Sequence, residues 1–299
     1  MNASVRLIES VVPTSVHLHV SVPESHPSAQ LLGTERTGSG TLIDESGVLI
    51  TVNYIVLGAD SIEVTLVDGT TLPGEAVAQD FYTGLAAVTV PAEALAAART
   101  RSSESAALGE EVFILASAGS TERRINSGAI SGLGPFDAYW EYRLERSIRT
   151  TAMNPGFGGG GLFLPTGELI GVVSLELGEI GRFTLAVPVE YFLDHSKELL
   201  RDGRRTSRPR RAWIGMFCYE LRENVVVGGI LPGGPGEHGG MKPGDVILVV
   251  DGRRIRERRS LYQCLWEHQP GDLITFQVFR NRGVKELSVL AADAEVFFA

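Results

Sequence analysis

The chain has 299 residues, of which 43% are hydrophobic and 21% charged, and its formal net charge is −9. This apolar content suffices for packed cores and excludes a disordered chain, and the length predicts two domains or three. No apolar run reaches the roughly 18 residues that cross a bilayer, so we expect no membrane span, and the negative charge argues against nucleic acid as a partner.

The N-terminus and the cysteines restrict the compartment and the chemistry. The opening MNASVRLIES lacks the apolar block of a signal peptide, which indicates a cytoplasmic chain or one whose leader has been removed. Cys218 and Cys264 stand alone without any CxxC, so one disulfide and two buried thiols both remain open. No cluster of His, Cys and carboxylates has metal-ligand spacing, and we expect neither a metal nor another cofactor.

Two arginine-rich stretches interrupt this acidic chain. Residues 201–211 contain six Arg and one Asp, and residues 253–259 contain five Arg and one Glu. A solvated linker and a solvated loop explain them most simply. An anionic partner, or docking onto the acidic body, is the alternative.

Short β-rich runs separated by turn residues fill the chain up to about residue 190. The run 16–22 comes first, and hairpins follow at 39–56, with a turn at 44–47, and at 61–78, with a turn at 68–69. Further strands are predicted over 110–117, 125–133, 141–150, 168–177 and 181–189. So many short strands indicate β-barrels or sandwiches, and the Ala-rich stretch 91–107 separates two halves.

A helix is predicted over 191–203, ended by Asp202-Gly203, and a linker over 204–211. Beyond it we expect a separate module. Its helix, 260–269, takes Ser260 as its N-cap, and Leu261, Cys264, Leu265 and His268 share one face. Its strands are predicted over 212–220, 224–231, 244–252, 272–280 and 285–291.

Two glycine-rich motifs differ in how strongly they indicate a functional site. GPGEHG at 234–239 matches GxGxxG, but KPGD follows at once and leaves no room for the long helix of a dinucleotide site. NPGFGGGGL at 154–162 is costly to order. It fits either a backbone that presents N–H groups, as in an oxyanion hole, or a plain mobile turn.

The order of these motifs resembles that of HtrA/DegP-type serine proteases over roughly residues 35–290. GGMKPGDVILVVDG at 239–252, which is similar to a PDZ signature, is its most specific part. The resemblance implies a mainly β chain with a chymotrypsin-like double β-barrel followed by a PDZ domain. The implied domains are a protease-fold domain at 1–200, with barrels at about 1–98 and 108–195, an Arg-rich linker at 201–211 and a PDZ domain at 212–299.

The resemblance also implies that the catalytic triad is lost. Where the family has its general-base His, its orienting Asp and its nucleophilic Ser, this chain has Tyr54, Gly84 and Gly158. A tyrosine titrates near 10 and is a poor base, and loss of the Ser or the His of a triad costs about a million-fold in kcat. The remnant oxyanion loop is Gly156, Phe157 and Gly158. Every His lies outside the aligned segments, so no other base is expected there, and we expect a pseudoprotease rather than an enzyme.

A PDZ module binds an extended C-terminal peptide as an added β-strand. By resemblance, the groove here consists of the loop Trp213, Ile214, Gly215 and Met216 with Leu261 and Leu265 on the facing helix. Its ligands would be peptide or protein C-termini that end in an apolar residue. The alternative is a PDZ domain that only packs.

The sequence therefore predicts an inactive HtrA-like protein that binds peptide or unfolded-protein C-termini as a scaffold, a chaperone-like holder or a regulator of an active relative. Two alternatives are an active endopeptidase and a structural subunit of a mixed HtrA oligomer. No Phe, Tyr or Trp precedes Gly38, which argues against a homotrimer built on N-terminal aromatics. The resemblance implies the cell envelope, in contrast to the N-terminus as given.

Overall fold

The computed structural model describes residues 3–177 and 182–299, which divide into two compact units. Unit 1 contains the residues up to Phe136 and Leu144–Thr206, and unit 2 contains Asp137–Arg143 and Ser207–Ala299. The division after Thr206 falls inside the expected linker. The segment Asp137–Arg143 does not follow the expected boundary: it belongs to the unit of the C-terminal module, because its side chains and backbone bond to that module.

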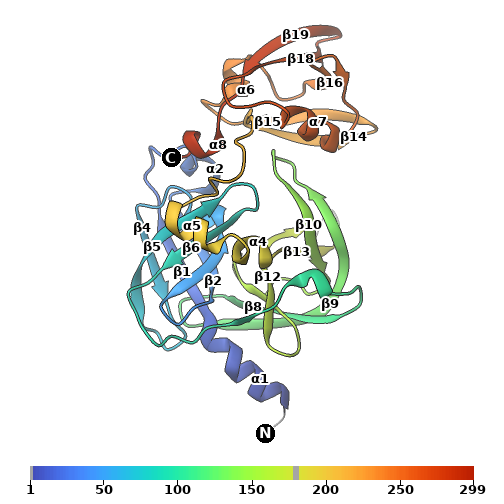
Figure 1. Ribbon diagram of the computed structural model, residues 1–299. Helices are drawn as coiled ribbons and strands as arrows, with labels where there is room; N and C mark the ends of the chain where they lie inside the picture. Colours follow the sequence, from blue (N-terminus) through green and yellow to red (C-terminus); the bar gives the residue numbers. More distant parts are fainter. Residues whose placement is uncertain (1–2, 178–181) are drawn as a thin grey trace. The chain divides into compact units, whose positions relative to one another are not determined.

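The first half of unit 1 is a closed six-stranded barrel in the order β1-β2-β3-β6-β5-β4 (Figure 1). Both predicted hairpins form, with Leu42 opposite Leu49 in the first and Thr65 opposite Thr71 in the second. Val16, Leu18 and Val20 alternate along β1 and are fully buried. The strands are β1 Ser15–Ser21, β2 Glu35–Leu42, β3 Val48–Val52, β4 Ser61–Thr65, β5 Thr71–Asp80 and β6 Leu85–Thr89.

The second half of unit 1 is a seven-stranded sheet in the order β11-β8-β9-β10-β13-β12-β7, and a further pairing of β11 with β12 closes its ring. The expected mainly β fold with two barrels is confirmed. The strands are β7 Arg99–Thr100, β8 Glu111–Ser117, β9 Arg123–Asp137, β10 Arg143–Thr150, β11 Gly161–Phe163, β12 Glu168–Leu177 and β13 Phe183–Pro188.

The helices of unit 1 are short. The helix expected over 191–203 is two helices, and the second ends as predicted at Gly203, whose φ of 73° is left-handed. Helix α1 was not predicted, although Leu7, Ile8 and Val11 have the spacing of one helix face. The helices are α1 Ala3–Val11, α2 Ala29–Leu32, α3 Asn53–Val56, α4 Glu190–Leu193 and α5 Ser196–Asp202, with 3₁₀ turns at Val12–Thr14 and Ser103–Ser105. Within the described residues, no helix is long and apolar enough to span a membrane.

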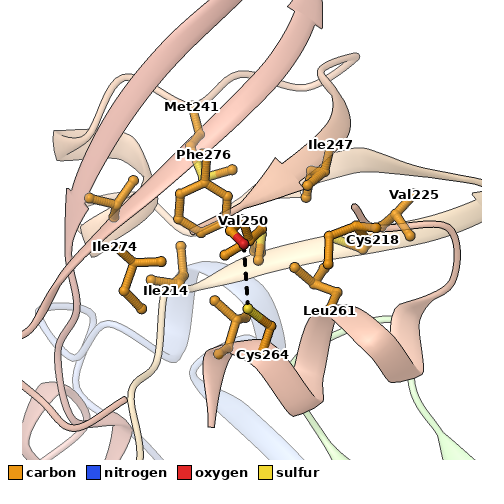
Figure 2. Packing of buried hydrophobic residues seen from close by; sticks show 14 of the residues in the cluster. Ile214, Cys218, Val225, Met241, Ile247, Val250, Leu261, Cys264, Ile274 and Phe276 are labelled. Atoms are coloured by element: carbon orange, nitrogen blue, oxygen red, sulfur yellow. Dashed lines mark hydrogen bonds between the residues drawn. The ribbon is translucent and has the colours of Figure 1, made fainter. Parts of the chain in front are cut away.

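Unit 2 is a sheet in the order β14-β15-β16-β18-β19, with β17 paired to β16. Figure 2 shows its core, where Cys264 from α7 packs under the sheet and its thiol lies 3.7 Å from the Val250 carbonyl. Cys218 and Cys264 are both buried, free thiols. The strands are β14 Met216–Leu221, β15 Asn224–Ile230, β16 Val246–Val250, β17 Arg253–Arg254, β18 Leu273–Arg280 and β19 Gly283–Leu290; the helices are α6 Pro235–His238, α7 Arg258–Leu265 and α8 Ala294–Phe297.

The predicted start of α7 was wrong by two residues. The helix begins at Arg258 with Glu257 as its N-cap, and the hydroxyl of Ser260 donates to the Glu257 carbonyl from inside the first turn. His268 lies beyond the end of α7 and pairs with Asp251 at 2.8 Å instead of extending the apolar face.

A buried ion pair stabilises the β16–β18 side of unit 2. Asp245 is fully buried, and its two carboxylate oxygens accept from Nε and Nη2 of Arg280, both at 2.6 Å. One of them also accepts from the Lys242 backbone N–H at 2.9 Å. Removing one partner of such a pair leaves an uncompensated charge.

We therefore expect Asp245→Ala to lower the free energy of unfolding of unit 2 by about 3 kcal/mol. Because Trp140, Trp213 and Trp266 all lie in unit 2, urea unfolding followed by tryptophan fluorescence reports on this unit. Glu267→Ala, which breaks an exposed pair with Arg253, is the control and should leave the midpoint nearly unchanged. Equal midpoints for both variants would contradict a stabilising role of the buried pair.

Candidate functional site

Tyr54 and Gly158 lie face to face in unit 1. Tyr54 belongs to α3, and its hydroxyl donates to the Ser174 carbonyl at 2.8 Å. A Cβ added to Gly158 would lie closer than 3.0 Å to that hydroxyl, while the φ of Gly158 is not left-handed. A side chain at residue 158 would therefore force the Tyr54 phenol to shift, since its hydroxyl fills the position that the side chain would take. Burial raises the pKa of Tyr54 to about 12, so this phenol is neutral at pH 7.

Gly84 is placed beside the same pair through its backbone. Its carbonyl accepts from the N–H of Asn53, the residue before Tyr54, at 2.8 Å, and its φ is 72°. The nearby Asp80 carboxylate is buried and accepts from the Thr83 hydroxyl and the Tyr82 N–H, both at 2.9 Å. The structure thus brings the three predicted positions together.

The glycine-rich loop after Asn154 is held by hydrogen bonds inside the chain. Gly156 donates to the Asn154 side chain at 3.4 Å and accepts from it at 2.9 Å, so one expected oxyanion donor is turned to the loop's own amide. Phe157 N–H donates to the Ser117 carbonyl at 2.9 Å, and Gly158 accepts from Ser39 N–H at 2.7 Å. These bonds order the segment, which is not a plain mobile turn.

A histidine does lie beside this loop, contrary to the expectation from the sequence. The ring of His17, on β1, lies 5.7 Å from that of Phe157, and its Nδ1 is 3.1 Å from the Ser117 hydroxyl. That hydroxyl is 3.1 Å from the Ser39 hydroxyl, which donates to the Phe157 carbonyl at 3.0 Å. Both serines are fully buried, so this chain of polar groups supports the loop from below. No sequence motif announces it, because the contact joins residues 100 positions apart.

The His17 cluster predicts a pH dependence of stability. Burial, followed by the charges of Arg123 and His19, lowers the pKa of His17 below 6.5, so the unfolded state binds the proton more readily. The contribution of neutral His17 is full above pH 6.5 and is lost as the pH falls from 6.5 through the folded-state pKa. His17→Gln should flatten the fall of the unfolding midpoint between pH 7 and 5, measured by circular dichroism. His238→Gln, at an exposed position in unit 2, should keep the wild-type slope; equal slopes in all three proteins would contradict this assignment.

The Tyr54–Gly158 contact predicts strong coupling between the two positions. Gly158→Ala alone should destabilise unit 1 by about 1–3 kcal/mol, since its methyl group overlaps the phenol oxygen. Tyr54→Phe removes that oxygen, and the nearest ring carbon then lies 3.3 Å from the new methyl group. In a double-mutant cycle measured by chemical unfolding, the double variant should lose less free energy of unfolding than the two single variants lose together. Additive losses would show that the two residues do not share this space.

In unit 2 a carboxylate occupies the loop before β14. Oε2 of Glu141 accepts from the Ile214 N–H at 2.8 Å, and Oε1 accepts from Gly215 N–H at 2.8 Å and Met216 N–H at 3.1 Å. Gly215 has a φ of 78°, which lets three successive N–H groups converge. Burial raises the pKa of Glu141 to about 7, against the lowering effect of the three N–H donors and of Arg211.

The residues before Glu141 continue along β14 as a short added strand. Trp140 forms an antiparallel bridge with Phe217, and the Cys218 N–H donates to the Tyr139 carbonyl. From α7, the hydroxyl of Tyr262 lies 2.8 Å from the carbonyl oxygens of both Ala138 and Trp140. The segment thus bonds to β14 on one side and to α7 on the other.

Only part of the predicted groove takes part in these contacts. Ile214, Gly215 and Met216 present the N–H groups, as the resemblance implied for this loop. Trp213 instead packs on Phe297 and Phe298, with ring centroids 4.9 and 5.7 Å apart. Leu261 and Leu265 are fully buried in the core of unit 2, with the segment 138–142 in place. Tyr262 and the segment 138–142 were not predicted, because no local sequence signal marks a loop that bonds to residues more than 70 positions away.

Comparison with known proteins identifies two domain families in the chain. The trypsin-like peptidase domain family matches residues 38–172, and the PDZ domain family matches residues 212–290. The chain joins a trypsin-like peptidase domain to one PDZ domain and matches the HtrA/DegP serine endoproteases. The HtrA-type protease AlgW, solved with a decapeptide, superposes with a TM-score of 0.58 at 25% identity over 97% of this chain and 98% of AlgW.

Two bacterial relatives are each named "Probable periplasmic serine endoprotease DegP-like". The one from Halomonas elongata is 31% identical over 288 residues, which cover 89% of this chain and 59% of the relative. The one from Ectopseudomonas mendocina is 29% identical over 290 residues, 90% of this chain and 59% of the relative. The chain therefore spans somewhat more than half the length of these relatives.

Proposed function

We propose that this HtrA-type chain is a pseudoprotease that binds the C-termini of peptides or unfolded proteins through its PDZ domain. The observation that carries the first half is the Tyr54 hydroxyl, which fills the space where a nucleophile on residue 158 would stand. A glycine gives no nucleophile, a phenol with a pKa of about 12 gives no base near neutrality, and Gly84 orients nothing.

The second half rests on the cradle of Ile214, Gly215 and Met216. Its three N–H groups bind one carboxylate, which is the recognition that a free C-terminus requires. We further propose an envelope location, since the relatives are named periplasmic, and a role as a scaffold, a chaperone-like holder or a regulator of an active HtrA relative.

An active endopeptidase is the second candidate, because the relatives are named serine endoproteases and His17 contacts the hydroxyl of Ser117. Its difficulty is access. Ser39 and Ser117 are both fully buried, so neither hydroxyl meets a peptide carbonyl without opening of the barrel.

A library of peptides with free C-termini, incubated with the full-length protein and analysed by mass spectrometry, separates the candidates. We expect peptides with apolar C-terminal residues to be retained intact and no fragments to be released. Fragments that disappear when Ser39 or Ser117 is replaced by Ala would overturn the pseudoprotease.

Two glycines of unit 2 provide a matched pair of variants for this experiment. Gly215 and Gly240 both have a φ of 78°, but an added Cβ meets the Trp213 ring at 3.0 Å only in the first case and nothing within 4 Å in the second. Gly215→Ala should distort the cradle and reduce retention at least tenfold, while Gly240→Ala should retain peptides like the wild type. Equal retention by both variants would place the binding site elsewhere.

A further inference from the structure

We propose that residues 138–142 are an internal ligand of the PDZ groove, which a C-terminus with an aromatic residue two positions before its end must displace. This inference rests on the proposed peptide-binding function and names both its partner and its regulation. It starts from the register of the bound segment along β14.

That register is the one a C-terminal peptide would have. The carboxylate of Glu141 sits in the cradle that ends at Met216, and the carbonyl of Tyr139, two residues earlier, accepts from Cys218, two residues later. The Trp140–Phe217 bridge lies between them and is antiparallel. Antiparallel pairing that runs toward a bound carboxylate is β-addition, here with a side-chain carboxylate in place of a terminal one.

The surroundings of Tyr139 indicate which residue the groove prefers at that position. The ring of Tyr139 lies 5.0 Å from that of Tyr219, and the guanidinium of Arg258 stands 4.9 Å over its face. An aromatic ring and a cation that converge on one side chain favour an aromatic residue. Trp140, by contrast, is 36% exposed, so the next position is expected to be permissive.

The segment is shaped so that it fits without a chain end. The Ala138 N–H donates to the Tyr142 carbonyl at 2.9 Å, which closes the segment into a tight turn that contains Glu141. At its base, Asp137 pairs with Arg259 of α7 at 3.3 Å. A free peptide lacks this turn, because its chain ends at the residue that corresponds to Glu141.

Tethering gives this internal ligand a constant advantage over a free one. A covalently attached segment competes at a high effective concentration, and the apparent affinity for an outside peptide falls by the fraction of time that the groove is open. Burial removes the Glu141 carboxylate from water, and this desolvation offsets part of the free energy that its hydrogen bonds to the cradle provide. A peptide carboxylate can therefore displace the segment.

The test uses the full-length protein and a fluorescein-labelled peptide, Gly-Gly-Ala-Tyr-Trp-Val with a free C-terminus, followed by fluorescence anisotropy. Glu141→Ala should bind the peptide at least tenfold more tightly than the wild type does. Glu145→Ala, an exposed position on β10, is the matched control and should bind like the wild type. Amidation of the peptide, or Ala in place of its Tyr, should reduce binding to Glu141→Ala at least tenfold.

Hydrogen exchange reports occupancy independently of any peptide. The amides of residues 214–216 and 218 should exchange faster in Glu141→Ala than in the wild type, and saturating peptide should slow them again. Tyr262→Phe, which leaves the cradle intact, should show a smaller change in the same direction. A near-wild-type far-ultraviolet circular dichroism spectrum would show that each variant folds.

The outcomes distinguish this inference from the function on which it rests. Unchanged exchange and unchanged affinity in Glu141→Ala would overturn the internal ligand even if the peptide binds. Faster exchange in Glu141→Ala without peptide binding to any variant would overturn both displacement by a C-terminus and the peptide-binding function. It would support only the occupancy of the groove by residues 138–142. Equal binding of the Tyr and Ala peptides would overturn the aromatic preference.

Discussion

Backbone N–H groups that leave water need an acceptor, and both candidate sites of this chain depend on how that need is met. Protease loops and PDZ loops leave such groups free for a ligand. Here the chain supplies acceptors itself: the Asn154 side chain for Gly156, and the Glu141 carboxylate for the loop 214–216. Each loop is thereby ordered without an external partner.

In unit 1, the contact between Tyr54 and Gly158 determines what residue 158 can carry. The two positions fit each other, since the phenol lies in the space that a glycine leaves, and its hydroxyl donates a hydrogen bond to the Ser174 carbonyl. A side chain added at residue 158 would therefore displace the phenol. The buried His17–Ser117–Ser39 chain supports the loop beside this pair.

Local sequence signals were sufficient to predict most of the strands. They predicted none of the long-range contacts that fill the two candidate sites. The turns at 44–47 and 68–69 predicted both hairpins because their residues satisfy turn geometry by themselves. The positions of Tyr54, Gly84 and Gly158 came from the resemblance, and the structure gathers them. His17, Tyr262 and Glu141 escaped prediction because their partners lie 73 to 124 residues away and no motif encodes such distances. The Ser260 cap failed because its hydroxyl bonds backward to Glu257 inside the helix.

A fluorophosphonate probe, which reacts with activated serines, tests the central claim most directly. The full-length protein is incubated with the probe beside an active DegP-type protease, and adducts are located by mass spectrometry. The account predicts full labelling of the active protease and none of this chain, because residue 158 has no hydroxyl and Ser39 and Ser117 are buried. Stoichiometric labelling of any serine, above all of Ser39 or Ser117 beside His17, would contradict it and reveal a working nucleophile.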